Sequence, residues 1–442
     1  MAQTTEPRAW RVLVINPGST STKVGLFDGE KPVFTVNVAH EASELAKFAG
    51  VSDQLPYRLG LIEAALAENG VDLASVDAFV GRGGGLLPLP GGTYEVDDVL
   101  LDHSARGANG VQHPAQLGPQ IAHALAARCG RPAFVVNPPD TDELCDEARM
   151  TGVRGVYRHV HLHALNLKET AIRHASSMGR AYEDCRFVVC HIGGGISVSA
   201  HDHGKMVDGA DIVGGEGPMA PTRAGALPVA EVLNYLEAGH GVAETRRLCM
   251  KTGGFVDLLG TSDALEVSQR AEAGDEAARR AWDAMLYQIC KEIGAMAAAL
   301  GGGVDGILLG GGMVHNKGLV AAIGERCGLD SPGHGLSGRV RARGHGRRRA
   351  PRPRRCRAAP PLLRQARLRG LSLLWRLAPD TGDVVSCQVK GTPLPAAAEA
   401  GRQGCPFSQG MINAPGVRCL AAGGQPVPTL RKNEHVPNLR VP

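Results

Sequence analysis

Two similar strand–turn–strand units, about 175 residues apart, constrain the fold of this chain more than any other feature. The first begins with the apolar run Val12–Ile15, typical of a strand buried on both faces, and reverses at Pro17-Gly18. The turn offers hydroxyl groups, backbone N–H groups and Lys23, all of which can hydrogen-bond phosphate oxygens. Taken alone the segment could instead be an ordinary polar hairpin, which we consider the weaker interpretation, and it lacks the Gly-Lys-Ser/Thr ending of a P-loop.

The second unit strengthens the phosphate-binding interpretation because it repeats the same plan. An apolar strand from Phe187 leads into Gly193-Gly-Gly195 and then into an alternating strand that ends at Ala200. Consecutive glycines let the backbone approach a ligand closely. A third glycine turn, Gly310-Gly-Gly312, follows the apolar segment Gly306–Leu309. Together these elements predict a duplicated α/β protein of two lobes with a phosphate-bearing ligand between them.

The motifs of the chain resemble those of a known superfamily, the acetate and sugar kinase/Hsp70/actin group, and within it the acetate kinase family, most of all its butyrate kinases. The resemblance covers roughly residues 10 to 328 and is carried by the motifs Asn16–Lys23, Gly81–Gly85, Leu162–Leu165, His191–Ser197, Pro221–Gly225, Leu259–Ala264 and Gly310–Met313. It implies two duplicated lobes of the acetate kinase/actin-like (ribonuclease H-like) type. A nucleotide cleft would lie between the lobes.

The resemblance also implies an activity. It is the reversible, ATP-dependent phosphorylation of butyrate, or of a related short or branched fatty acid, to the acyl phosphate by direct in-line transfer. ATP/ADP and Mg²⁺ are the implied cofactors, a short-chain carboxylate is the implied substrate, and a homodimer or higher homo-oligomer is expected. The residues implied to contact nucleotide or phosphate are Asn16, Ser19, Ser21, Lys23, His191, Gly193, Gly194, Gly195, Asp263, Gly310, Gly311 and Gly312.

Arg82 and Arg223 are the arginines expected to take part in the chemistry. Phosphoryl transfer to a carboxylate brings several negative oxygens together, and a guanidinium can stabilise them bidentately. Both arginines stand beside small residues that leave room for a ligand. From local sequence alone each could instead form a surface or interlobe salt bridge, but both match active-site arginines of the family.

Several histidines are further candidates. His159, His161 and His163 alternate, which on a strand would put them on one face and suggest zinc, but no acidic or cysteine partner is evident and a helix follows. The resemblance places His163 near the transferred phosphoryl group. His113 could match another family histidine or could lie in a surface loop.

Asn137 departs from the family pattern. The strand at residues 133–136 ends where the family has an aspartate thought to serve the metal or the attacking carboxylate, so the resemblance assigns Asn137 to a catalytic position. Asparagine cannot act as a base and is a weaker ligand for a hard cation. Asp140, three residues later, is a candidate substitute, and no metal ligand is assigned.

Charge divides the chain unevenly. The net charge is +4, but the two parts of the chain have opposite charges. Residues 1–328 are acidic, with 28 Lys and Arg against 39 Asp and Glu. Residues 329–442 form a basic tail, with 20 Lys and Arg against 5 Asp and Glu. The tail holds half of the 28 prolines. It could be a nucleic-acid-binding arm or a disordered linker, but we interpret it as a frame-shifted translation of a GC-rich gene, which would leave the edge of the second sheet uncovered.

The predicted organisation is therefore an N-terminal lobe over residues 1–165, a C-terminal nucleotide-binding lobe over 166–328, and a disordered tail over 329–442. Scattered cysteines without CxxC pairs, and the absence of an apolar leader or spanning segment, favour a soluble cytoplasmic protein with no membrane partner. Two other functions stay open: a catalytically impaired nucleotide-binding homologue, and nucleic-acid binding through the basic tail, which we consider the weaker of the two.

Overall fold

The computed structural model describes residues 9–328 and 385–387, which form two β-sheets with helices packed against them. The predicted α/β class with a duplicated plan is confirmed. The predicted lobe boundaries remain predictions, and most of the proposed frame-shifted tail lies outside the described residues.

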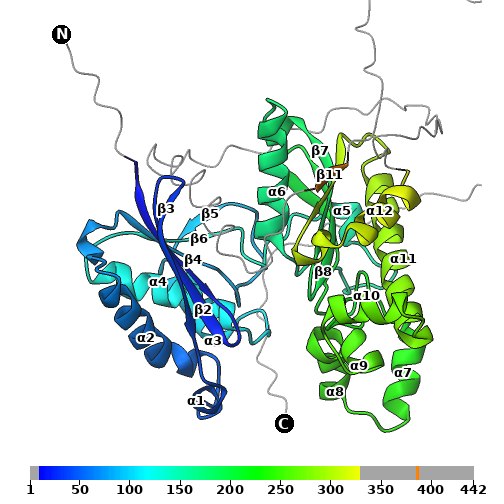
Figure 1. Cartoon of the computed structure of the whole chain (residues 1–442), viewed down its shortest axis with the longest axis horizontal. Helices are drawn as coiled ribbons and strands as arrows, with labels where there is room; N and C mark the ends of the chain where they lie inside the picture. The colour runs from blue at the N-terminus through cyan, green and yellow to red at the C-terminus, as the bar shows by residue number, and fades with distance from the viewer. Residues whose placement is uncertain (1–8, 329–384, 388–442) are drawn as a thin grey trace, which may run out of the picture. The chain divides into compact units, whose positions relative to one another are not determined.

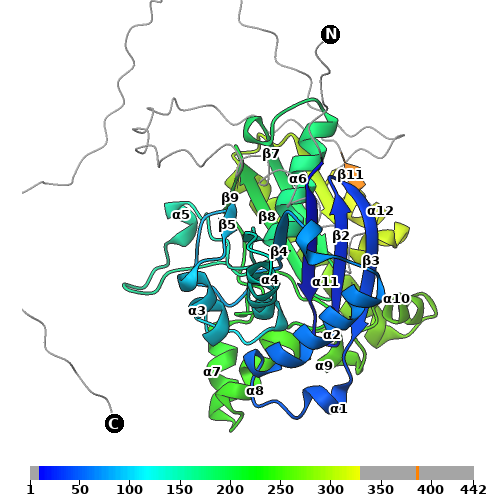
Figure 2. The same cartoon turned by 90° about the vertical axis from the view of Figure 1, so that its left-hand side faces the viewer.

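The first sheet has six strands in the order β3-β2-β1-β4-β6-β5. Its centre is the predicted hairpin, with β1 (Arg11–Pro17) antiparallel to β2 (Ser21–Asp28), which pairs in turn with β3 (Lys31–Ala39). On the other side of β1 lie β4 (Ala78–Gly81) and β6 (Ala133–Val136), both parallel, and the short antiparallel β5 (Thr93–Glu95). Figure 2 shows β1, β2 and β3 side by side.

Alternating side chains of β1 enter two different cores, as the continuous apolar run predicted. Leu13 and Ile15 pack with helices α2 (Leu55–Glu68) and α4 (Leu117–Ala127), which lie on one side of the sheet (Figure 1). Val12 and Val14 face the other side. The helices α1 (Ala42–Leu45) and α3 (Asp98–Arg106) complete this part of the chain.

The second sheet has five strands in the order β11-β10-β7-β8-β9. The predicted second hairpin is β7 (Arg186–Ile192) with β8 (Ile196–Asp202), followed by β9 (Lys205–Asp208). Strand β10 (Gly306–Gly310) lies parallel to β7, as β4 lies parallel to β1 in the first sheet. The two hairpins therefore occupy equivalent places in the two sheets.

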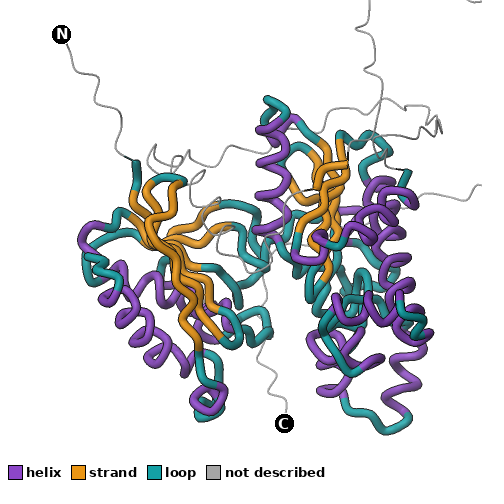
Figure 3. Tube along the Cα trace, viewed as in Figure 1, coloured by secondary structure: helices purple, strands orange, loops and turns teal. Residues whose placement is uncertain are grey.

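Helices cover both faces of the second sheet (Figures 1 and 3). On one face α6 (Ala164–Ser177) packs with Phe187 and Val189. On the other, α10 (Ala264–Glu272), α11 (Glu276–Ala299) and α12 (Lys317–Arg326) pack with Val188 and Ile192. The remaining α-helices of the described chain are α5 (Asp146–Arg149), α7 (Val229–Glu237), α8 (Val242–Arg247) and α9 (Phe255–Leu259), and a π-helical turn at Leu248–Thr252 links the last two.

Part of the tail reaches the second sheet, contrary to the expectation that its edge is uncovered. Strand β11 (Val385–Cys387) pairs antiparallel with β10, whereas the equivalent neighbour of β4, strand β6, is parallel. Three residues of backbone pairing therefore satisfy the edge that the sequence pattern left open. Among the helices between residues 9 and 328, none is both long and apolar enough to cross a membrane.

Candidate active site

The first hairpin brings three of the predicted residues onto one face of its sheet. Asn16 and Lys23 are directly opposite each other in the β1–β2 register, so their side chains share a face. Arg82 follows β4, and its Nη1 donates to the Asn16 Oδ1 at 3.4 Å. The structure therefore places Arg82 beside the hairpin, although the two segments are 66 residues apart.

Helix α4 approaches β4 so closely that only glycines fit at the contact. A Cβ added to Gly81 would lie 2.2 Å from the Gly118 carbonyl oxygen, and one added to Gly118 would lie 2.1 Å from the Arg82 carbonyl oxygen. The close contact fixes the backbone from which the Arg82 side chain leaves.

Arg58, which the sequence interpretation missed, stabilises the turn of the first hairpin by hydrogen bonds. Its side chain is fully buried, and its guanidinium donates to the Gly18 carbonyl at 2.8 Å, the Ser19 carbonyl at 3.2 Å and the Thr22 hydroxyl at 3.3 Å. Burial lowers its pKa to about 10. Ser19 itself is exposed and Ser21 half-buried. Arg58 therefore holds the turn in place with its polar edge uncovered.

The second hairpin organises two neutral histidines. His191 lies opposite Ser197 in the β7–β8 register, and its Nδ1 lies 2.9 Å from the Oδ1 of Asn166 in α6. The His163 ring stacks on His191 at 3.9 Å between centroids. The pKa of His191 is lowered to about 3, and that of His163 well below its ordinary value, chiefly by burial and further by the charges of Arg82 and Arg223.

Ser197 fixes the orientation of His163, which stands just before α6. The Ser197 hydroxyl accepts from the His163 backbone N–H at 3.3 Å and lies 2.8 Å from His163 Nδ1. If that hydroxyl donates its proton to Nδ1, a neutral imidazole carries its own proton on Nε2. His163 is then a hydrogen-bond donor to an anionic oxygen without being a cation.

Arg223 sits directly on the glycine turn of the second hairpin. A Cβ added to Gly195 would lie 1.3 Å from Arg223 Nη1, so the guanidinium occupies the space that any other side chain at 195 would need. Its Nε donates to the Met250 carbonyl at 3.3 Å. Its Nη1 is buried and has no hydrogen-bond partner among the described residues. A buried donor of this kind is a site for an anionic oxygen.

The two predicted arginines act on the same region. The pKa of Arg223 is lowered to about 10, first by burial and next by the positive charge of Arg82. Both arginines also lower the pKa of His161 to about 4, after the larger effect of burial. Burial and, to a smaller extent, the positive charges of Arg82 and Arg223 also lower the pKa of His113. The Nδ1 of His113 accepts a hydrogen bond from the Ala115 N–H at 3.0 Å. The structure therefore brings Arg82, Arg223, His163 and His113 into one positive neighbourhood.

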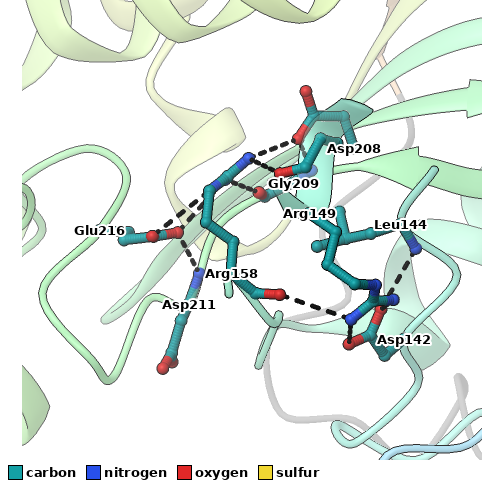
Figure 4. Close-up of polar contacts among 9 residues, drawn as sticks. Asp142, Leu144, Arg149, Arg158, Asp208, Gly209, Asp211 and Glu216 are labelled. Atoms are coloured by element: carbon teal, nitrogen blue, oxygen red, sulfur yellow. Dashed lines mark hydrogen bonds and ion pairs between the residues drawn. The ribbon is translucent and has the colours of Figure 1, made fainter. Parts of the chain in front are cut away.

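An arginine network anchors the segment that carries the histidines (Figure 4). The Arg158 guanidinium donates to the Gly209 carbonyl at 2.6 Å and to the carboxylates of Asp208 and Glu216 at 3.2 and 3.3 Å. Glu216 also accepts from the Asp211 N–H at 3.1 Å. Arg158 thus ties the histidine segment to the chain that leads to Arg223. His159, His161 and His163 do not lie on a strand, contrary to the alternation considered above.

The side chain of Asn137 hydrogen-bonds to the backbone of the loop before β5. Asn137 has a positive φ of 38°, a conformation that asparagine tolerates better than most residues, and its Oδ1 accepts from the Gly92 N–H at 2.8 Å. Its own N–H donates to the Gly92 carbonyl at 2.9 Å. The Asn137 side-chain oxygen therefore holds the loop before β5.

The glycines and the aspartate predicted to hold nucleotide take three different positions. Gly194 is exposed and its carbonyl accepts from the Thr222 hydroxyl at 2.8 Å, while the Gly193 N–H donates to the Gly195 carbonyl at 3.2 Å. Gly311 has a φ of 96°, and a Cβ there would lie 2.5 Å from the Ile192 carbonyl oxygen, so Gly310-Gly-Gly312 closes against the end of β7. Asp263 caps α10, accepting from the Leu265 N–H at 2.8 Å.

A cavity of about 640 Å³ lies beside these groups. Aliphatic side chains dominate its wall, among them Leu86, Val232, Leu233 and Leu236, and its polar lining includes His161, Asp140, Asn109 and Asp211. Met250, whose carbonyl accepts from Arg223, also lines it. The cavity has the size and apolar character to hold a short hydrocarbon chain next to the arginine.

Asp140, the predicted substitute for Asn137, is a buried carboxyl with one oxygen unused. Its Oδ1 accepts from Asn109 Nδ2 at 2.5 Å, and its Oδ2 has no hydrogen-bond partner among the described residues. His161 Nδ1 lies 3.8 Å from Oδ1. Burial raises the pKa of Asp140 to about 6. The nearby Leu86 N–H, which makes no hydrogen bond with Oδ2, and the Asn109 amide oppose this rise to a smaller extent.

This raised pKa predicts a specific pH dependence of stability. The folded protein binds the Asp140 proton more tightly than the unfolded chain does, so the stabilisation is present below the ordinary pKa of 3.8 and is lost as pH rises through about 6. Because one pKa unit corresponds to about 1.4 kcal/mol, the ionised carboxyl costs about 3 kcal/mol above pH 7. Asp140→Asn should therefore raise the free energy of unfolding at pH 8, and this gain should shrink as pH falls toward 4.

Urea unfolding of the parent and the variant across that pH range measures the gain. Asp283→Asn, an exchange at an exposed position within α11, is the matched control and should stay within about 0.5 kcal/mol of the parent. A pH-independent difference for Asp140→Asn would show that this carboxyl does not titrate with a raised pKa.

Sequence reasoning missed three supporting residues: Arg58, Asn166 and Ser197. The sequence did contain a signal for Arg58. It lies four residues before Ile62, on the buried face of α2, and a charged side chain on a buried face needs a hydrogen-bonding partner. Asn166 and Ser197 occur within or beside quoted motifs, but their contacts with His191 and His163 depend on tertiary structure.

Comparisons with known proteins identify a related sequence family and related folds. Residues 151–325, which include Arg223 and both stacked histidines, match the sequence model of the acetokinase family. The solved Porphyromonas gingivalis acetate kinase is 22% identical, with a TM-score of 0.56 and coverage of 73% of this chain and 88% of that chain.

Two further solved structures share the fold. An acetate kinase from Entamoeba histolytica is 17% identical with a TM-score of 0.59, covering 72% of this chain and 86% of that one. A propionate kinase from Francisella tularensis is 16% identical with a TM-score of 0.58, covering 73% and 90%. These identities are low, so the likeness concerns the fold. Residues 151–325 therefore match the acetokinase family model, and the described chain has the fold of acetate and propionate kinases.

Proposed function

We propose that this protein catalyses the reversible, ATP-dependent phosphorylation of butyrate, or of a related short or branched fatty acid, to the acyl phosphate. One observation carries the proposal. The buried Nη1 of Arg223 lacks a partner among the described residues, and the Arg223 side chain contacts the wall of an apolar cavity of about 640 Å³. An anionic head with a hydrocarbon tail fits that combination.

In the proposed phosphoryl transfer, the two arginines supply positive charge and the neutral His163 supplies a hydrogen bond. Arg223 and Arg82 would bind the carboxylate and stabilise the negative charge on the transferred phosphoryl oxygens. His163 would donate a hydrogen bond from Nε2 to one of these oxygens. These fixed donors would hold the carboxylate and the transferred phosphoryl group in line with each other. Holding both groups in this orientation lowers the entropic part of the activation barrier.

The nucleotide would bind at the two hairpins. Asn16, Lys23 and the Ser19–Ser21 turn offer donors to its phosphates, and Arg58 keeps that turn in place. The Gly193–Gly195 turn and Gly310–Gly312 let the backbone approach the ligand. Asp263 uses a carboxylate oxygen as a helix cap, so its part in nucleotide binding would be to shape the adjacent loop.

Mg²⁺ would be held mainly by the nucleotide. Within residues 9–328 and 385–387 no cluster of three or more His, Cys, Asp and Glu side chains could hold a metal ion. Magnesium commonly keeps several waters and binds through substrate phosphates, where it neutralises negative charge. We therefore assign no step to a protein-held metal.

The proposal is tested by measuring ADP release and acyl phosphate together. Purified full-length protein with ATP, Mg²⁺ and butyrate should form both in equal amounts, and should make ATP from butyryl phosphate and ADP. Oligomeric state and cytoplasmic location remain predictions from the sequence.

A nucleotide-binding homologue without turnover is the second candidate, and Asn137 favours it. The side-chain oxygen of Asn137 accepts a hydrogen bond from the Gly92 N–H, and an asparagine cannot serve as a base. Titration of ATP binding beside the turnover assay separates the two functions. Binding without any acyl phosphate would support the second candidate.

The apolar cavity also predicts a preference for chains longer than acetate. Each additional buried methylene contributes up to about 0.8 kcal/mol, so the two extra methylenes of butyrate could raise kcat/KM by roughly tenfold. Competition between acetate and butyrate measures this ratio directly. A higher kcat/KM for acetate would contradict the proposed place of the hydrocarbon chain.

A further inference from the structure

The cavity contains a feature that a plain fatty acid does not use. Asp140 lines it, is 3% exposed, and has a carboxylate oxygen, Oδ2, without a hydrogen-bond partner among the described residues. The other oxygen has a structural task. It accepts from Asn109, whose own Oδ1 accepts from the Val111 N–H at 2.9 Å, and so orders the loop before His113.

Among the described residues, no lysine or arginine forms an ion pair with this carboxylate. His161 Nδ1 lies 3.8 Å from Oδ1, but the pKa of His161 is lowered to about 4, so its imidazole is neutral near pH 7. A buried acceptor without a hydrogen-bond donor is costly in a wall where aliphatic side chains dominate. A hydrogen-bond donor on the bound molecule would remove the cost.

We propose that the acyl chain accepted by this site carries a hydroxyl group, which donates to Oδ2 of Asp140. This inference rests on the proposed carboxylate kinase function and names its substrate class: short-chain hydroxycarboxylic acids. The carboxylate would lie at Arg223, the hydrocarbon part against Leu86 and α7, and the hydroxyl at Asp140.

The charges around the cavity favour a hydroxyl over an ammonium group as the donor. Arg223 and Arg82 both depress the pKa of His161, which shows that their positive potential extends to this end of the cavity. An amino acid chain would bring a third cation into that potential. A neutral donor satisfies the Asp140 oxygen without such repulsion.

The discrimination should be large because it depends on pairing a buried charged acceptor. Sites built to hydrogen-bond a substrate hydroxyl reject analogues that lack it far more strongly than apolar pockets reject an extra methylene. We therefore expect at least one of 2-, 3- and 4-hydroxybutyrate to exceed butyrate at least tenfold in kcat/KM. 4-Aminobutyrate should be a poorer substrate than that hydroxy acid.

The test measures ATP-dependent acyl phosphate formation by the full chain with these four acids and butyrate, in the parent and in Asp140→Val. The variant should lose the preference and favour butyrate, since valine removes the acceptor. Asp140→Asn keeps the size, and with its oxygen on Asn109 it presents an NH2 group that can donate to the same substrate hydroxyl, so it should retain part of the preference. Asp283→Asn, exposed in α11, should leave the ratio unchanged.

Three results would overturn the inference: butyrate equal to or better than every hydroxybutyrate, 4-aminobutyrate as the best substrate, or an unchanged ratio in Asp140→Val. If Asp140→Val does not fold, the parent's selectivity and the Asp140→Asn ratio still decide. The proposed function fails separately, when no carboxylate is phosphorylated at all, whereas turnover of butyrate without a hydroxyl preference leaves it standing.

Discussion

Replacing Arg223 with alanine should lower acyl phosphate formation by about 10²–10³-fold or more, while ATP binding stays within about threefold of the parent. The guanidinium has a buried Nη1 without a hydrogen-bond partner among the described residues, and in the proposed mechanism it stabilises the negative charge of the transferred group; removing one such preorganised donor typically costs this much. The loss should appear in kcat/KM for the carboxylate.

Steady-state kinetics and an ATP-binding titration on the same preparation check this result. Arg280→Ala is the matched control, because Arg280 is exposed on α11 and pairs with Glu276 one helical turn away. Activity of Arg223→Ala within threefold of the parent would remove Arg223 from the active site.

Gly195→Ala should reproduce most of the Arg223→Ala defect without touching an ionisable group. The added Cβ would lie 1.3 Å from Arg223 Nη1, so the guanidinium must leave its position. The backbone of Gly195 has no positive φ, so the substitution introduces no backbone strain of its own. We expect a loss of about 10²-fold in kcat/KM, by the same loss of a positioned donor.

A double-mutant cycle shows whether the glycine acts through the arginine. In the Arg223→Ala background, Gly195→Ala should cost little more, because the displaced group is already absent. Gly152→Ala serves as the control, since a Cβ there meets nothing within 4 Å. Additive losses would mean that Gly195 contributes independently of Arg223.

The parts of this fold that local sequence pattern determines were predicted well. Val12–Ile15 is apolar at successive positions, and the strand is buried on both faces because alternating side chains enter different cores. Both hairpins follow in the same way from their apolar strands and their turn residues.

The site was only partly predictable, because its geometry depends on contacts between distant segments. The resemblance supplied Arg82, Arg223 and His163, but the fit of Arg223 against Gly195 requires the tertiary structure. From its sequence position Arg58 is an ordinary helix residue, and only the tertiary structure shows that its guanidinium donates to the turn of the first hairpin. Asp140 was considered as a replacement for Asn137, and the structure instead puts it in the wall of a cavity that no local pattern reveals.

The edge strand shows a second limit of sequence patterns. Residues 385–387 lie in the short valine-rich run Val384–Val389, which is typical of a strand, but the run follows a long basic, proline-rich stretch and the whole tail was interpreted as frame-shifted. An exposed sheet edge can pair with such a run wherever it lies in the sequence.

The central claim, that the arginine and the cavity form a carboxylate kinase site, is tested most directly by one measurement. Purified full-length protein is incubated with ATP, Mg²⁺ and a panel of short-chain carboxylic acids, and acyl phosphate is trapped as the hydroxamate while ADP is quantified. The account predicts one acyl phosphate per ADP, with acids of four carbons favoured over acetate. Bound ATP with no acyl phosphate from any acid would contradict it.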